Sequence, residues 1–166
     1  MTKNESKKFL GIDPGIATTG WGIIEKSGGR VSLVDYGAII TSPRDSFSER
    51  LKELHEKLDK IIRSHELEAV AVEELFFAKN VKTAMAVGQA RGVILMTIME
   101  NNLPLREFTP LEVKQAITGF GRADKKQIQQ MVKVLLGLKN IPQPDDAADG
   151  LAIAITLANS FKNYLK

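Results

Sequence analysis

The sequence FLGIDPG, residues 9–15, is typical of a short buried β-strand that ends at Asp13 and is followed at once by a Pro-Gly turn. Side chains alternate along a strand, so Gly11 and Asp13 share one face while Leu10 and Ile12 take the other. The first face therefore carries almost no side-chain volume beside its carboxylate. Such a surface lets another element of the fold approach Asp13 closely.

Two further β-rich runs follow, residues 20–25 and 31–40, and a Ser-Gly-Gly turn separates them. Three consecutive strands with short connections predict an antiparallel meander. Residues 46–64 come next, and their apolar side chains recur every three or four positions. This spacing indicates a surface helix with one buried stripe.

The rest of the chain alternates between strands and helices. Residues 68–74 (EAVAVEE) predict a strand that joins the sheet in parallel, because a helix precedes it. The remaining predicted elements are a helix over 79–102, a strand over 105–108 and three helices, which begin after Thr109, after Asp124 and at Pro144, the last running to about Phe161. This order predicts an α/β fold with a mixed five-stranded sheet and helices on both faces.

Four carboxylates are expected to meet in this fold. If the strand that ends at Glu73 neighbours the first strand, Glu73 and Asp13 lie side by side, because adjacent strands are ~4.8 Å apart. The Ala-rich last helix begins with PDDAAD, where Asp146 and Asp149 share one face of the first turn. Four acids without histidine or cysteine suit Mg²⁺ or Mn²⁺, and a pair of such ions serves phosphodiester cleavage. Helix capping also explains an aspartate at this position, so spacing alone leaves both interpretations open.

Composition limits the class of protein. The chain has 166 residues and no cysteine, which excludes a disulfide scaffold, a zinc ribbon and a thiol nucleophile. With 43% apolar and 26% charged residues it is typical of a globular protein. No apolar stretch reaches the ~20 residues that cross a bilayer, and residues 1–8 lack the apolar core of a signal peptide. We expect one domain over 1–166, a flexible tail over 1–8, a cytoplasmic location and no membrane association.

Positive charge is concentrated in one part of the chain. Residues 79–139 carry 10 basic and 4 acidic side chains, whereas the net charge of the whole chain is only +3. A strongly basic segment is expected of a surface that faces phosphates. A solvated lysine-rich face gives the same pattern, so charge alone does not decide between them.

Five motifs together resemble one family. They are GIDPG (11–15), VEELFFAKN (72–80), GQARG (88–92), VKQAITGFGRADKKQI (113–128) and DDAADGLAIAIT (145–156). In this order they resemble the RuvC family of bacterial Holliday-junction resolvases, over residues from about Phe9 to Ala158. The resemblance implies a ribonuclease H-like fold and a homodimer that makes two symmetric cuts in a four-way DNA junction. Each cut is expected to leave a 5′-phosphate and a 3′-hydroxyl, and RuvA and RuvB are the partners that it implies.

The resemblance also implies roles for single residues. The metal-binding catalytic acids are Asp13, Glu73, Asp146 and Asp149, which agrees with the set expected from spacing. Lys114 and Lys125 match functional lysines beside the scissile phosphate. Phe76 matches an aromatic that meets bases at the junction, although its neighbour Phe77 leaves open which ring does so. The expected DNA contacts, mostly in the basic segment, are Phe76, Lys79, Lys82, Arg91, Lys114, Arg122, Lys125 and Lys126. Two Mg²⁺ ions per site, or Mn²⁺, are the implied cofactors.

Other interpretations stay open at this point. A phosphate-binding ATPase of the actin-like kind has a comparable Asp-Gly-Thr loop but needs two lobes. A non-catalytic junction or RNA binder has no reason to keep four acids, and YqgF-type nucleases lack the Asp-Ala-Ala-Asp helix start. Gly88 and Gly92 allow close helix approach, either within the chain or in a homodimer. His55 and His65 have no partner at ligand spacing and are expected on the surface.

Overall fold

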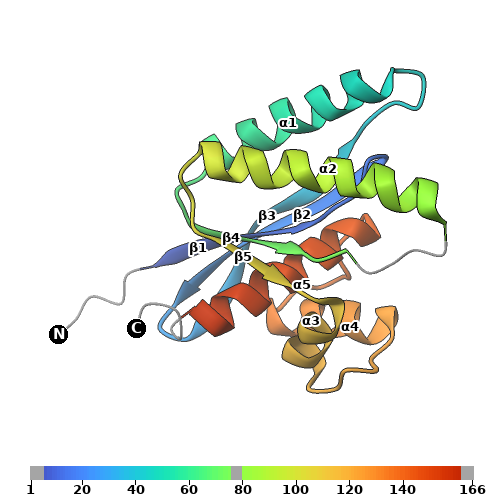
Figure 1. Cartoon of the computed structure of the whole chain (residues 1–166). Coiled ribbons are helices and arrows are strands. Elements are labelled where there is room, and N and C mark those ends of the chain that lie inside the picture. Colours follow the sequence, from blue (N-terminus) through green and yellow to red (C-terminus); the bar gives the residue numbers. More distant parts are fainter. Residues whose placement is uncertain (1–5, 76–79, 162–166) are drawn as a thin grey trace.

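A five-stranded mixed sheet forms the centre of the molecule (Figure 1), seen in a computed structural model that describes residues 6–75 and 80–161. Its strands are β1 (Lys7–Asp13), β2 (Thr18–Ser27), β3 (Arg30–Ile40), β4 (Leu67–Glu73) and β5 (Leu105–Phe108). They lie in the order β3-β2-β1-β4-β5. The first three form the expected antiparallel meander, and β4 and β5 join in parallel, as predicted.

Helices cover both faces of this sheet. On one face lie α1 (Phe47–Arg63) and α2 (Val81–Glu100), which pack on side chains of Leu10, Ile12, Val70 and Val72. On the other lie α3 (Pro110–Thr118), α4 (Lys125–Leu135) and α5 (Asp145–Ser160), against Phe9, Ala69 and Ala71. The alternation of the strands therefore divides the core into two layers, and the predicted order of elements is confirmed.

Helix α5 lies directly against β1 and β2. Every residue from Ala147 to Ala158 is buried except Asp149, which is partly exposed. A β-carbon on Gly11 would overlap the backbone of α5 at Gly150 and Ala154, so only glycine allows this close packing. The small face expected around Gly11 is thus filled by the Ala-rich last helix, as predicted.

The ends of two elements differ from the prediction, and side-chain contacts explain both. Strand β1 begins at Lys7, where the ammonium group lies 2.7 Å from the carboxylate of Glu68, so the expected tail over 1–8 is wrong for residues 7 and 8. Helix α2 begins at Val81 and not at residue 79, because the Asn80 side chain accepts hydrogen bonds from the N–H groups that follow it.

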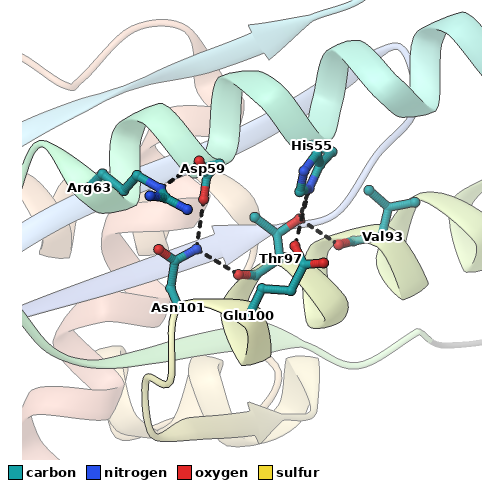
Figure 2. Close-up of polar contacts among 7 residues, drawn as sticks. All are labelled: His55, Asp59, Arg63, Val93, Thr97, Glu100 and Asn101. Atoms are coloured by element: carbon teal, nitrogen blue, oxygen red, sulfur yellow. Dashed lines mark hydrogen bonds and ion pairs between the residues drawn. The ribbon is translucent and has the colours of Figure 1, made fainter.

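Helices α1 and α2 are joined by polar contacts as well as by the core (Figure 2). The Thr97 hydroxyl donates to the carbonyl of Val93 at 2.8 Å, so its oxygen is free to accept from Nδ1 of His55 at 2.9 Å. One turn further, the Asn101 amide donates to Asp59 at 2.8 Å. These bonds fix how the two helices lie on the sheet. No helix within 6–75 or 80–161 is long and apolar enough to cross a bilayer.

Candidate active site

Two neighbouring strands bring Asp13 and Glu73 to the same edge of the sheet. Each acid is the last residue of its strand, and β1 and β4 run parallel with Ile12 opposite Val72. Both acids line a cavity of about 240 Å³. Helices α3, α4 and α5 supply its other lining residues, which are Pro110, Val113, Lys114, Lys125, Ile128, Asp149 and Ala152.

The first turns of α5 supply two more acids. Carboxylate oxygens of Asp13, Asp146 and Asp149 lie within 4.8 Å of one another. The residue that caps α5 is Pro144, whose side chain makes no capping hydrogen bond. Capping of α5 therefore does not account for Asp146 and Asp149, which converge on Asp13. Glu73 is not one of these three but opens into the same cavity.

Burial and mutual repulsion change the titration of these acids. Burial, followed by the charges of Glu73, Asp149 and Asp146, raises the pKa of Asp13 to about 8. Burial and then the charge of Asp149 raise the pKa of Glu73 to about 7, which Lys114 partly opposes. Burial also raises the pKa of Asp149 against the effect of Lys125. The ionised acids would carry more negative charge than the neighbouring lysines neutralise.

Two lysines enter the cavity from the helices below it. The ammonium group of Lys125, in the first turn of α4, lies 3.2 Å from Asp149 and 3.8 Å from Asp145. Burial lowers the pKa of Lys125, but the attraction of these acids outweighs burial and raises it. Lys114 of α3 lines the cavity beside Glu73. Both lysines thus lie beside the acids, and their expected role at the scissile phosphate stays a prediction.

The donor set suits a divalent cation. Its ligands are carboxylate oxygens alone, the type that Mg²⁺ and Mn²⁺ prefer. Burial and then the charges of neighbouring acids raise the pKa values of Asp13 and Glu73, and a bound cation would favour the ionised form of both. The residues present therefore fit a metal centre of this class.

A model of the family described as crossover junction endodeoxyribonuclease RuvC matches residues 9–157 of the chain. The chain belongs to the RuvC family. The RuvC of Caldicellulosiruptor saccharolyticus is 58% identical over 149 residues, which are 89% of this chain and 90% of that protein. The RuvC of Rubrobacter xylanophilus is 54% identical over 163 residues, 98% of this chain and 91% of that protein. A solved structure described as T. thermophilus RuvC in complex with Holliday junction substrate gives a TM-score of 0.85 at 34% identity, over 95% of this chain and 96% of that chain.

Membership in the RuvC family confirms the resemblance and the ribonuclease H-like fold. It also decides against the actin-like ATPase and the YqgF-type nuclease, because the family match extends over almost the whole chain. The RuvC relatives are named endodeoxyribonucleases, and this chain carries an acidic cluster that could hold a metal ion.

The residues expected to contact DNA fall into four groups in this RuvC-family chain. Phe76, Phe77 and Lys79 lie outside the described residues. Lys82, Arg122 and Lys126 are exposed on the surface, and Lys114 and Lys125 line the cavity. Arg91 differs from all of these: its side chain is only 17% exposed and its guanidinium pairs with Glu107.

Sequence reasoning missed two features of this site. Asp145 holds the Lys125 ammonium together with Asp149, and its position in the PDDAAD run was the only signal. Gly20 faces Asp13 across the β1–β2 pair, and a β-carbon there would overlap the backbone of Asp146. The Gly-x-Gly spacing of residues 20–22 within a strand marks such a close approach, by the same argument that was applied to Gly11.

Proposed function

We propose that this RuvC-family protein is a structure-selective endonuclease that resolves four-way DNA junctions by paired, metal-dependent phosphodiester hydrolysis during recombination and repair. The observation that carries the proposal is the convergence of Asp13, Asp146 and Asp149 beside a cavity that Asp13, Asp149 and Glu73 line together with two lysines. The RuvC of T. thermophilus, described in complex with Holliday junction substrate, supports the choice of DNA.

The metal ligands that we propose are Asp13, Glu73, Asp146 and Asp149, and we propose Mg²⁺, two ions per site, with Mn²⁺ able to replace it. When bound there, such ions supply an activated water and stabilise the charge of the leaving 3′-oxygen, which accounts for 5′-phosphate and 3′-hydroxyl products. The chain itself contributes charge at fixed positions. Lys114 and Lys125 stabilise the negative charge of the scissile phosphate. Lys125 exchanges its ion pair with Asp149 for one with the phosphate when DNA binds.

DNA binding falls mainly to the basic segment 79–139, through Lys79, Lys82, Arg122 and Lys126, with little reading of bases. The exposed positions of Lys82, Arg122 and Lys126 support this proposal. Phe76 follows Glu73 by three residues in the sequence, and we propose that it stacks on an unpaired base at the crossover.

Two symmetric cuts need two active sites, so we propose a homodimer. One face of α2 supports this: Met85, Gln89, Gly92, Met96 and Met99 are all exposed and recur every three or four residues. A groove of about 620 Å³ between α1 and α2 includes Gly92 and Met96. Gly88 faces Leu75 of its own chain instead, so the open face belongs to Gly92. Cooperation with RuvA and RuvB, in the cytoplasm, completes the proposal by family resemblance.

Cleavage of defined DNA tests the proposal. A four-way junction with one labelled arm at a time, a linear duplex of the same sequence and a structured RNA are incubated with the protein in Mg²⁺ or in EDTA. We expect paired nicks in opposite strands of the junction alone, in Mg²⁺ alone, and religation by DNA ligase. Binding of the junction without any cut in Mg²⁺ or Mn²⁺ would show a non-catalytic binder, and equal cutting of the duplex would remove the structure selectivity.

A further inference from the structure

Arg91 of α2 makes two contacts at the point where β4 leaves the sheet. Its Nε donates to the main-chain carbonyl of Glu73 at 3.3 Å. Its Nη2 pairs with the carboxylate of Glu107, a residue of β5 whose register partner in β4 is Val72. With 17% of its side chain exposed, Arg91 is engaged within the protein, unlike the exposed lysines around it.

Arg91 makes both contacts from the face of the sheet opposite the acidic cluster. Helix α2 packs on the face formed by Leu10, Ile12, Val70 and Val72, whereas the acidic cluster lies on the α5 face. Arg91 therefore contacts the backbone of Glu73 from the α2 face, whereas the Glu73 carboxylate lies on the α5 face. A guanidinium can hold a carboxylate and a carbonyl at once because its donors form a rigid fork, which a lysine ammonium does not reproduce.

Strand β5 also holds the end of β4. The Glu74 N–H donates to the carbonyl of Phe108 at 2.8 Å, and this bond from β5 ends the pairing of the two strands. Strand β4 ends at Glu73, and Glu74 and Leu75 already lie outside it. The Arg91 bond therefore fixes the main chain at the last residue of the strand, whose carboxylate has to reach the acidic cluster.

We propose that Arg91 is a positioning residue for Glu73: together with Glu107 it fixes the end of β4 so that the Glu73 carboxylate meets Asp13 and Asp149 at the metal centre. It also ties α2, the helix proposed to carry the second protomer, to the active site. The inference rests on the proposed function for the role of Glu73 as a metal ligand. It replaces the expectation that Arg91 contacts DNA.

Metal binding by the full-length protein without DNA tests this directly. Mn²⁺ is titrated by calorimetry into the wild type, Arg91→Lys, Arg91→Gln and Glu107→Gln, well below the Tm of each. We expect both Arg91 variants to bind Mn²⁺ about 10-fold more weakly, the loss typical of a group that orients a metal ligand, and Glu107→Gln to lose less because the Nε bond remains. Arg63→Lys is the matched control, since Arg63 pairs with Asp59 on α1, away from the cluster.

Junction binding in EDTA and cleavage against Mg²⁺ concentration complete the test. Arg91→Lys should bind the junction as the wild type does and need more Mg²⁺ for half-maximal cleavage. Weaker junction binding with unchanged Mn²⁺ affinity would make Arg91 a DNA contact and overturn the proposal. A lower Tm with unchanged Mn²⁺ affinity would overturn it too, because Arg91 would then only stabilise the fold. If the wild type binds Mn²⁺ but cuts nothing, the proposed function fails while the titration still decides on Arg91.

Discussion

Asp13 carries the largest electrostatic cost at the site. Burial and the charges of Glu73, Asp149 and Asp146 raise its pKa from the ordinary value of 3.8 to about 8. Between these two pH values the folded protein holds a proton on Asp13 that the unfolded chain has released. The free energy of unfolding of the metal-free protein therefore falls as the pH rises through this window, which is the reverse of an acid held by a salt bridge.

Asp13→Asn should remove much of this pH dependence and raise the Tm of the metal-free protein near pH 9. The neutral amide avoids the repulsion, and each kcal/mol gained raises the Tm by ~2–4 °C for a domain of this size. Thermal unfolding in EDTA from pH 5 to pH 9 measures the effect. Asp45→Asn, on the exposed loop before α1, is the control for a general change of charge. Equal slopes for the wild type and Asp13→Asn would contradict the assignment.

Asp146→Asn should abolish cleavage while leaving junction affinity near that of the wild type. The amide keeps the size of the side chain but loses the charge that holds a hard cation, whereas binding depends on the basic segment. Cleavage rates in Mg²⁺ and binding in EDTA separate the two effects. Asp45→Asn, on the exposed loop before α1, is the matched control and should retain most activity. More than a few per cent of the rate in Asp146→Asn speaks against its role.

The packing of α5 on β1 and β2 sets the position of two of the four acids. No side chain separates Gly20 from the backbone of Asp146, so the distance between strand and helix is the smallest that the backbones permit. Because the helix is rigid, a shift at its first turn moves Asp146 and Asp149 together. Activity and stability are therefore coupled at this contact.

Gly20→Ala should lower both the Tm and the cleavage rate. The added methyl group overpacks the contact, a change that costs ~1–3 kcal/mol, and displaces the start of α5. Calorimetry and the junction assay measure the two losses. Gly92→Ala is the comparison for folding, because nothing lies within 4 Å of its β-carbon and alanine favours a helix interior by ~1 kcal/mol. A Gly20→Ala protein with unchanged Tm would contradict the close packing.

Alternation and capping residues made the elements predictable. The face of Gly11 and Asp13, the parallel joining of β4 and the caps at Thr109 and Asp124 all follow from local sequence, and the structure confirms them. The convergence of Asp13 with Asp146 and Asp149 was expected from spacing and is confirmed as geometry. Local sequence does not show which residue forms an ion pair with a given charged side chain.

Arg91 shows this limit. Its place in the basic segment favoured a DNA contact, but its partner Glu107 comes from β5 and meets it only after the layers pack. Lys125 is similar, since Asp145 and Asp149 reach it from α5. Ion pairs between distant elements depend on the folded distances, which no pattern along the chain records.

At the scale of the whole molecule, one face of α2 is exposed. Among the described residues, no other part of the chain covers it. Met96 is 63% exposed in the middle of this face. Methionine adapts to irregular surfaces, which suits a contact between two copies of one helix. A two-fold contact uses the same surface of both copies, so one substitution changes the interface twice.

Met96→Glu should convert the dimer into a monomer. Each copy would bring one carboxylate into the apolar contact, and burying these unpaired charges costs several kcal/mol. Sedimentation at micromolar concentration should give a mass near twice 18.3 kDa for the wild type and near 18.3 kDa for the variant. Val134→Glu, an exposed apolar residue on α4, is the control and should stay dimeric. A wild type that stays monomeric on the junction contradicts the dimer.

The buried position of α5 also bears on how the protein is made. Asp13 and Glu73 belong to strands synthesised early, whereas Asp146 and Asp149 belong to the last described element of the chain. Until α5 leaves the ribosome, Gly11 and Gly20 have nothing packed on them and only half of the acids exist. A nascent chain therefore carries an incomplete acidic cluster while its basic segment is already translated. The order of the elements itself delays the nuclease until α5 has been synthesised.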